Sequence, residues 1–493
     1  MNKCKLPNFI VLIVIIYVLI FSTLSIVRHE LFYTGWDLGL CEQIIWNTKE
    51  GNFFYSNEYN MNFLGHHFNL VFLLLMPVYY LLPYTHTLLI LQTVAIATGA
   101  VIIFFLTKKV TNNKQTSKIM SIIYIMNPLL WHMNLADFHP IILFIPLFLI
   151  MILYLEKNEL KKYWFFLFLT LLVKENVSLI IVFLGIFIYF FKKKTVGLKT
   201  ILIGICWFII TINIIMPYLN SEHSNLEIKG EYDFFKDRYY YLGENIIEIG
   251  KTILTNPIYV LTYTDSYTKT NPSIKIKYSL LFLIWFACLP MYSIFTIVGI
   301  PIFLQNLLSV DSYQLCLTSH HNASLLIILF VSTIFGLSKI KKTVIYKKII
   351  FSLILINLFL SVFIGLIPLI SDNHSNLIYR EECLVAFEIK PDQNNELQQS
   401  RKYIKQLFKD IPNNSTIACS EHTFPHLIKK GDVITVHEYG SSKEANIKHK
   451  DFVIIDTSDT LIFHYEVFLS TYEQRSFERR FGNSSFFIFK ETI

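Results

Sequence analysis

Ionisable side chains lie in short polar segments beside long apolar runs of the sequence. Asp37 lies ten residues after the first run, within the polar and aromatic stretch 28–69. A charged group beside a bilayer costs free energy unless it has a partner or a function. Because a carboxylate can act as a general base on an acceptor hydroxyl, Asp37 is the candidate catalytic residue.

Further polar segments between the apolar runs supply imidazoles, an amine and more carboxylates. Lysine and histidine can bind a departing phosphate through charge-assisted hydrogen bonds. We therefore expect these side chains to bind substrate and to meet near Asp37 at the outer ends of the helices. The candidates are His66, His67, Asp137, His139, Lys174, Glu175, His320 and His321.

Each candidate also has a purely structural interpretation. Asp37 could cap the helix that begins LGLCEQIIW, since aspartate is a favoured N-cap residue. Asp137 with His139 could form a turn before Pro140, and Lys174 with Glu175 could form an internal ion pair. The histidine pairs could be solvated side chains at the membrane interface. Glu42 follows Asp37 by five positions, about 140° around a helix, so we expect it to lie apart from Asp37.

No cofactor is predicted. The sequence contains neither HExxH nor CxxC, so its spacing supports no metal site. A divalent metal could still use aspartate, glutamate and histidine ligands from separate segments.

The composition is that of a membrane protein. The chain has 493 residues, of which 53% are hydrophobic and 16% charged, against about 25% charged residues in soluble domains. A crossing helix needs about 20 mainly apolar residues, and such runs recur from Phe9 to Ile370. We predict an all-α polytopic membrane domain at 1–370 and a soluble domain at 371–493.

Lysine clusters set the expected orientation. They fill alternate loops, which the positive-inside rule places in the cytoplasm. This pattern, rather than nucleic-acid binding, explains the net charge of +7. The amino terminus is then cytoplasmic, and loops 28–69 and 217–276 and the carboxy-terminal domain are extracytoplasmic. Eleven crossings satisfy this arrangement: 8–27, 86–107, 118–133, 140–156, 160–174, 177–191, 198–216, 276–289, 291–308, 322–338 and 349–370.

Two parts of the chain lie outside these predicted crossings. Residues 70–83 are apolar but short, and a crossing there would invert every later loop, so we expect a re-entrant or surface-lying helix broken near Pro77. After residue 371, short apolar strands alternate with helical stretches, which predicts a small α/β domain.

Several segments, taken in order, resemble the DUF2079 family of predicted membrane proteins. They are GWDLGLCEQIIWNT, LGHHFNLVFLLLMPVYYLL, ADFHPIILFIPL, LLVKENVSLI, SHHNASLLI and, in the tail, IPNNSTIACSEHTFPHLIKKGDVITV with DFVIID. The family is similar in layout to the GT-C glycosyltransferases. That resemblance implies inverting transfer of a sugar from a polyprenyl-phosphate donor to an extracytoplasmic acceptor, with Asp37 at the position of the catalytic carboxylate. Asp37 is flanked by Trp36 and Leu38 rather than by a second acid.

The partners implied are membrane lipid, a lipid-linked sugar donor and an unidentified acceptor. Two other functions fit the sequence: a membrane transporter, or a non-catalytic scaffold that displays the carboxy-terminal domain. Transport is less favoured because the ionisable residues gather at helix ends rather than at mid-membrane depth, where transport sites lie.

Overall fold

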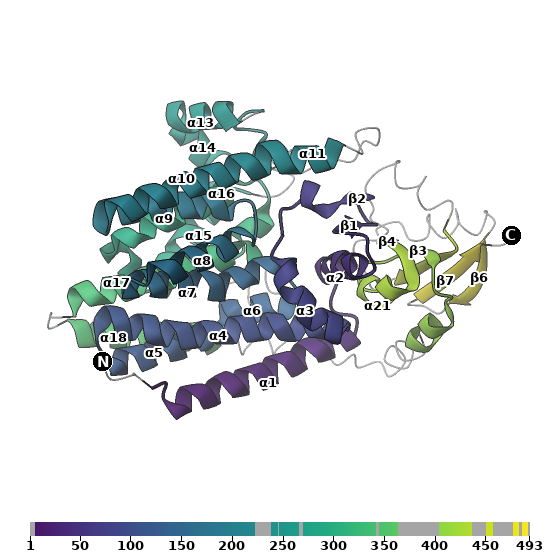
Figure 1. The fold of residues 1–493 in the computed structure, drawn as a ribbon, viewed down its shortest axis with the longest axis horizontal. Helices are drawn as coiled ribbons and strands as arrows, with labels where there is room; N and C mark the ends of the chain where they lie inside the picture. The colour runs from purple at the N-terminus through teal and green to yellow at the C-terminus, as the bar shows by residue number, and fades with distance from the viewer. Residues whose placement is uncertain are drawn as a thin grey trace.

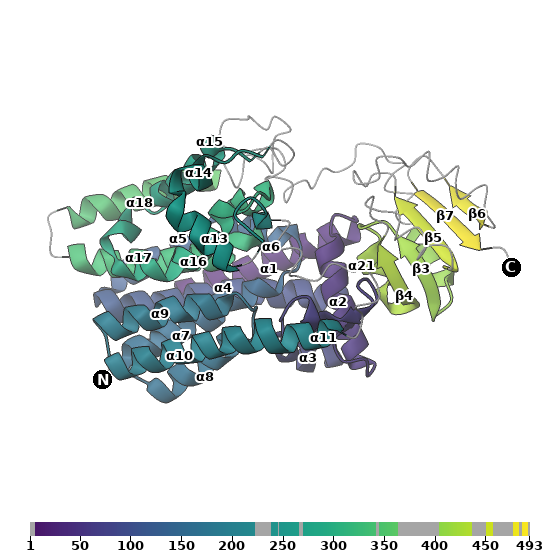
Figure 2. The ribbon, with the colours of Figure 1, turned by 90° about the horizontal axis from the view of Figure 1, so that it is seen from above.

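A bundle of helices occupies one end of the molecule and a β-sheet the other, as Figures 1 and 2 show. The amino terminus lies at the end of the bundle far from the sheet, and the carboxy terminus lies beside the sheet. The structure is a computed structural model. It describes residues 5–221, 238–244, 246–265, 270–341, 345–362, 404–435, 450–456, 477–482 and 486–491. The predicted boundary at residues 370 and 371, and parts of loop 217–276, lie outside the described residues.

Helices lie within each of the eleven predicted crossing segments. They are α1 (Asn8–Glu30), α4 (Thr85–Thr111), α5 (Lys114–Ile125), α6 (Pro128–Ala136), α7 (Phe144–Lys157), α8 (Leu160–Leu171), α9 (Val177–Phe191), α10 (Lys194–Ile210), α15 (Pro272–Trp285), α16 (Ile300–Leu308), α17 (Ala323–Ile340) and α18 (Tyr346–Leu360). Among the described residues, six helical stretches are long and apolar enough to cross a membrane. They are Asn8–Glu30, Thr85–Thr111, Lys114–Ala136, Pro140–Lys157, Lys194–Asn220 and His320–Ile340.

Local polar signals set several helix ends. The side chain of Asn113 accepts hydrogen bonds from the backbone amides of Gln115 and Thr116 at the start of α5. Asn127 caps α6 in the same way, and Pro128 follows it at the first helical position. These caps divide one predicted crossing, 118–133, into two consecutive helices.

The outer surface of α1 is apolar and uncovered. Leu12 and Leu19 are 58% and 63% exposed, as suits side chains that face lipid. The opposite side of α1 packs on α4, where Tyr17 and Phe21 join the core of the bundle.

The short apolar segment after loop 28–69 forms α3 (Phe72–Leu81), with Pro77 inside the helix. Its start is tied to the turn between α8 and α9. The backbone amide of Val71 donates to the carbonyl of Leu172 at 2.8 Å. The side-chain amide of Asn69 donates to the carbonyl of Val173 at 2.7 Å. The loop that carries Asp37 is thus fastened to the turn that carries Lys174.

The described residues of the carboxy-terminal region form a sheet and short helices. Its five-stranded sheet has the order β4-β3-β5-β7-β6, in which β3 is parallel to β4 and β5, and β7 is antiparallel to β5 and β6. The strands are β3 (Ser415–Cys419), β4 (Gly431–Thr435), β5 (Phe452–Asp456), β6 (Phe477–Gly482) and β7 (Phe486–Glu491). Helix α21 (Phe424–Leu427) connects β3 to β4. Strand β6 has no counterpart in the sequence prediction.

The segment that connects β3 to β4 packs on helix α2 (Trp36–Lys49), which follows the first crossing and lies beside α21 in Figure 2. Gln43 of α2 donates to the carbonyl of Val433 in β4 at 2.7 Å. Glu58 accepts hydrogen bonds from the backbone amide of Thr435 at 2.6 Å and from its hydroxyl at 2.7 Å. Loop 28–69 and the tail strands also share one hydrophobic core. The loop therefore folds against the tail as well as against the membrane helices.

Helices α9 and α10 form a hairpin whose backbones touch at glycines. A Cβ placed on Gly197 would lie 2.2 Å from the backbone nitrogen of Tyr189, and one on Gly185 would lie 2.6 Å from that of Ile201. Because backbone cannot move aside as a flexible side chain can, only glycine fits at these positions.

We predict that Gly197→Ala lowers the stability of the protein by about 1–3 kcal/mol, the usual cost of overpacking. The matched control is Gly250→Ala in α13 (Ile246–Thr255), where no atom lies within 4 Å of the added Cβ. Thermal unfolding in detergent should show a lower Tm for Gly197→Ala and an unchanged or slightly raised Tm for the control. Equal Tm values would contradict the close contact of α9 and α10.

Candidate functional site

The carboxylate of Asp37 forms a pair with His139. The Nε2 atom of His139 lies 3.1 Å from Oδ2 of Asp37. The side chain of Asp37 is 43% exposed, whereas that of His139 is only 5% exposed. The buried imidazole thus holds a carboxylate that remains open to an incoming molecule.

Asp37 does not cap its helix, so the capping interpretation is wrong. The N-cap residue of α2 is Gly35, and Asp37 lies in the first turn. A negative charge is favourable there because the amide groups of the first turn point toward it. Its described hydrogen bond goes to another segment of the chain.

Asp137 and Gln92 brace the chain around this pair. The backbone amide of Gly35 donates to Oδ2 of Asp137 at 3.1 Å, which joins the Asp37 segment to the Asp137 segment. Gln92 of α4 donates to the carbonyl of Asp137 at 2.7 Å and accepts from the amide of His139 at 2.8 Å. Asp137 and His139 therefore form a turn before Pro140, as the structural interpretation expects, and this turn also positions the His139 side chain.

Arg28 makes a second tie between the same segments. Its Nε donates to the carbonyl of Leu135 at 2.8 Å and its guanidinium donates to the carbonyl of Tyr33 at 3.1 Å. The residue is 3% exposed. A buried arginine at the end of α1 is costly unless it is hydrogen-bonded, and here it joins the end of α6 to the start of the outer loop.

His320 stacks on His139, with ring centroids 3.7 Å apart and an angle of 21° between the rings. His321 lies beside His320 at 4.2 Å between centroids. Asp37, His139 and His320 each offer one ligand atom, and these atoms lie within 4.8 Å of one another. The trio could hold a divalent metal, although it comes from three segments and has no signature in the sequence.

Lys174, Glu175 and His67 form the neighbouring part of the site. Oε1 of Glu175 lies 3.8 Å from Nζ of Lys174 and 3.6 Å from Nδ1 of His67. Oε2 of Glu175 accepts from the backbone amide of Phe68 at 3.0 Å. Lys174 and Glu175 are thus an ion pair, and Glu175 also holds the end of loop 28–69.

The charges of two cations, Lys174 and Arg238, link the group around Asp37 to the group around Glu175. The charges of Lys174 and Arg238 both act on His320 and His321, and His321 also interacts with His139 and His67. Arg238 itself forms an ion pair with Asp311 at 3.7 Å. The structure therefore brings the separated sequence candidates into one cluster around Asp37.

His66 has a different environment from the other candidates. It is 2% exposed, and its ring packs against Tyr59 with centroids 4.2 Å apart. Burial, followed by the neighbouring charges of His67 and Lys174, lowers the pKa of His66 well below its usual value. It packs as a neutral ring at the edge of the cluster.

Glu42 faces away from Asp37, as its position on the helix predicts. It is fully buried, accepts a hydrogen bond from the hydroxyl of Tyr79 at 2.8 Å, and lies 3.5 Å from Nζ of Lys429 in the tail. Its role is to join α2 to α3 and to the tail.

Sequence reasoning missed Gln92, Arg28 and Arg238. Gln92 lies within an apolar run, where a single polar residue was the available signal, and Arg28 opens loop 28–69 beside two other ionisable residues, His29 and Glu30. Arg238 lies in the charged and aromatic segment DFFKDRYYYLGENI of loop 217–276, from which the sequence analysis took no candidate.

Burial and nearby charges shift the pKa values of Asp137 and His139. Burial, together with the nearby charge of Asp37, raises the pKa of Asp137 to about 7. Burial alone would lower the pKa of His139, but the charge and hydrogen bond of Asp37 outweigh it and the pKa of His139 is raised. The raised pKa favours a protonated His139, which lies beside the carboxyl group of Asp37.

We predict that Asp137→Asn changes how stability depends on pH. The pKa of Asp137 is higher in the folded state than in the unfolded state. Its carboxyl group therefore stabilises the folded state fully below about pH 4, the unfolded pKa. This stabilisation is lost as the pH rises through about 7. Asparagine does not ionise. The difference between the Tm of the variant and the Tm of the wild type should therefore rise, in favour of the variant, by several degrees between pH 5 and pH 8.

The control for this series is Asp410→Asn, which changes an exposed acid of residues 404–410. Its Tm should follow the wild-type curve at every pH. Parallel curves for Asp137→Asn and the wild type would contradict the raised pKa.

The fold is similar to that of a solved GT-C glycosyltransferase, ArnT from Cupriavidus metallidurans bound to undecaprenyl phosphate. The TM-score is 0.53 at 9% sequence identity, and the alignment covers 97% of each chain. The apo structure of the same protein aligns with a TM-score of 0.49 at 9% identity, over 96% of this chain and 97% of the other. The likeness to the undecaprenyl phosphate-bound structure, at a TM-score of 0.53, supports a GT-C-like layout of the fold.

A comparison with curated protein sequences found no match. The model of the family described as "Predicted membrane protein (DUF2079)" matches residues 28–478, a range that contains Asp37 and every other candidate site residue. This match agrees with the apolar helices of the structure and confirms the resemblance drawn from the sequence motifs. The chain belongs to the DUF2079 family of membrane proteins.

Proposed function

We propose that this protein is an integral membrane glycosyltransferase that transfers a sugar, with inversion, from a polyprenyl-phosphate donor to an extracytoplasmic acceptor. The observation that carries the proposal is the half-exposed Asp37 held by His139. The ring of His139 stacks on His320, on which the charges of Lys174 and Arg238 act. A carboxylate that acts as a base on the acceptor and cations that bind a phosphate are the two groups that this reaction needs.

The fold adds to the argument. ArnT, to which the chain is similar in fold, was solved with undecaprenyl phosphate bound. The cluster lies at helix ends: Lys174 lies between α8 and α9, Asp137 follows α6, and His320 begins the helical stretch that contains α17. A lipid-linked substrate would present its phosphate at this level while its chain lies along apolar helices.

The proposed reaction is a single displacement. Asp37 orients the acceptor and takes its proton as the acceptor attacks the anomeric carbon. The bond between that carbon and the phosphate oxygen breaks, and the phosphate leaves with the electron pair. Lys174 and Arg238, with the neighbouring imidazoles, stabilise the charge on the leaving phosphate. His139 holds Asp37 in place throughout.

The orientation is part of the proposal. The lysine-rich loops place the amino terminus in the cytoplasm, so the Asp37 cluster and the domain at residues 371–493 face the extracytoplasmic side. The donor sugar and the acceptor would then meet outside the cytoplasm.

We predict that Asp37→Asn abolishes the reaction. Loss of a general base costs about 10²–10⁴ in rate, so a gene-deleted host that expresses the variant should show the surface glycans of the deletion strain. Mass spectrometry of the glycans measures this. Glu50→Gln, at the far end of α2 and 49% exposed in its side chain, is the control and should restore the wild-type pattern. An Asp37→Asn strain with wild-type glycans at equal expression would reject the catalytic role.

We predict that Lys174→Gln and Arg238→Gln each weaken binding of undecaprenyl phosphate about 10–100-fold, since a hydrogen bond to a charged group contributes about 1.5–3 kcal/mol. The control is Lys251→Gln in α13, which changes an exposed lysine of the same outer loop as Arg238. Binding is measured by native mass spectrometry of the purified chain. Unchanged binding in both variants would place the phosphate elsewhere.

A further inference from the structure

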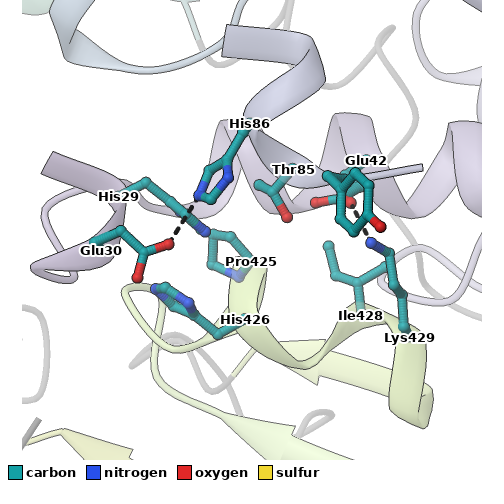
Figure 3. A pocket seen from close by; sticks show the side chains of 10 residues that line it. His29, Glu30, Glu42, Thr85, His86, Pro425, His426, Ile428 and Lys429 are labelled. Atoms are coloured by element: carbon teal, nitrogen blue, oxygen red, sulfur yellow. Dashed lines mark hydrogen bonds and ion pairs between the residues drawn. The ribbon is translucent and has the colours of Figure 1, made fainter. Parts of the chain in front are cut away.

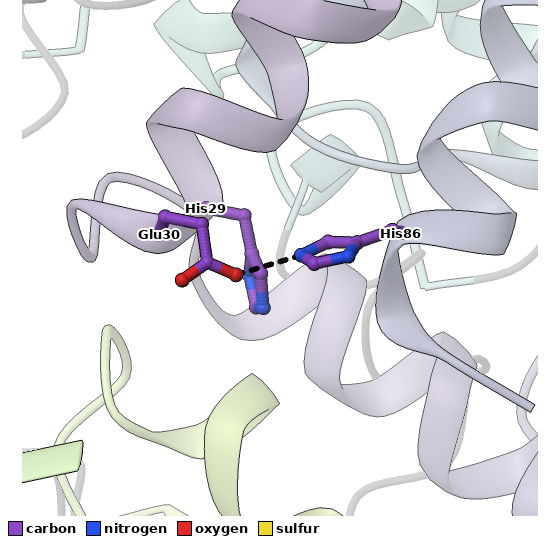
Figure 4. A group of neighbouring side chains, drawn as sticks. All are labelled: His29, Glu30 and His86. Carbon is purple, nitrogen blue, oxygen red and sulfur yellow. Dashed lines mark hydrogen bonds and ion pairs between the residues drawn. The ribbon is translucent and has the colours of Figure 1, made fainter.

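A second group of side chains that could hold a metal ion lies outside the Asp37 cluster. It contains His29 and Glu30 at the end of α1 and His86 in the first turn of α4 (Figure 4). Nε2 of His86 lies 2.8 Å from Oε1 of Glu30. Each of the three residues offers one ligand atom, and these atoms lie within 4.8 Å of one another.

Hydrogen bonds to neighbouring residues occupy one polar side-chain atom of His29 and one of Glu30, and the other polar atom of each remains as a metal ligand. Nδ1 of His29 lies 2.9 Å from the hydroxyl of Thr34, which leaves Nε2 as the ligand atom. Lys405 of the tail donates to Oε2 of Glu30, which leaves Oε1 toward His86. Such outer hydrogen bonds fix the ring orientation and the free atom of metal ligands in proteins.

The group borders a cavity of about 170 Å³ between the membrane helices and the tail (Figure 3). His426 of α21 lies on its tail side, and its ring stacks on that of His29 with centroids 4.1 Å apart. Nε2 of His426 is buried and has no hydrogen-bond partner among the described residues. The cavity leaves space for a water molecule as a further ligand.

We propose that His29, Glu30 and His86 bind one divalent transition metal ion, of which Zn²⁺ fits best. Zinc takes imidazole nitrogen and carboxylate oxygen at about 2.0–2.2 Å in a tetrahedron, so its ligand atoms lie about 3.3 Å apart. Binding displaces the proton shared by His86 and Glu30. The ion is structural: it fastens α1 to α4 at the place where His426 and Lys405 of the tail dock.

This site is independent of the proposed glycosyl transfer. Its ligands come from α1 and α4 and include none of Asp37, His139 and His320. The proposal would stand if the protein transferred no sugar.

The test is a zinc titration of the purified full chain in detergent after removal of metal with a chelator. Bound zinc is measured by mass spectrometry of the metal, and Tm is measured with and without Zn²⁺. We expect the wild type to bind zinc and to gain Tm. His86→Gln should weaken binding at least tenfold and lose the gain in Tm, whereas His86→Cys should restore both because cysteine is also a zinc ligand.

Asp37→Asn is the control because it removes a ligand from the other possible metal group. It should leave the affinity for zinc and the gain in Tm at wild-type values. The proposal is overturned if the wild type binds no zinc, if His86→Gln binds as tightly as the wild type, or if Asp37→Asn rather than His86→Gln removes the binding. His86 is partly exposed, so we expect His86→Gln to fold. Normal folding of His86→Cys would show that position 86 tolerates substitution.

Discussion

The contact between Asp37 and His139 is the interaction on which the rest of the site depends. The two residues are separated by 102 positions in the sequence and meet at 3.1 Å. Such a contact holds only if both segments are fixed, and the chain uses buried polar groups to fix them. Gln92 holds both ends of the Asp137–His139 turn, and Arg28 joins the same region to the start of the outer loop. A hydrogen bond left unmade in such surroundings costs about 1–3 kcal/mol, which favours this one arrangement.

The tail contributes to the same rigidity. Helix α2, which carries Asp37, lies between the membrane helices and the sheet, and its Gly39 approaches the ring of Phe424 so closely that a Cβ there would lie 2.4 Å from the ring. Gln43 and Glu58 add hydrogen bonds to β4. The outer loop and the tail share a hydrophobic core, so the position of Asp37 depends on the tail being docked. This dependence gives the tail a physical role in the site even though it supplies none of the candidate residues.

The sequence locates the helices and singles out the polar residues that we propose as the site, because both leave local signals. Apolar runs locate the helices, and pairs such as Lys174 and Glu175 stand out against them. Strand β6 and the division of crossing 118–133 by Asn127 and Pro128 were missed, since a strand rich in charge and a cap within an apolar run have weak signals. The trio Asp37, His139 and His320 could not be found from spacing, because its members come from three segments that only the fold brings together. The same holds for His29 and His86.

The central claim is that the Asp37 cluster serves a lipid-linked phosphate substrate. The most direct measurement is mass spectrometry of the lipids that co-purify with the full chain from its membrane, compared with those of the Arg238→Gln variant. The account predicts a polyprenyl phosphate, with or without its sugar, that is enriched with the wild type and depleted with the variant. Recovery of bulk phospholipids alone, or of the same polyprenyl species in equal amount from both proteins, would contradict it.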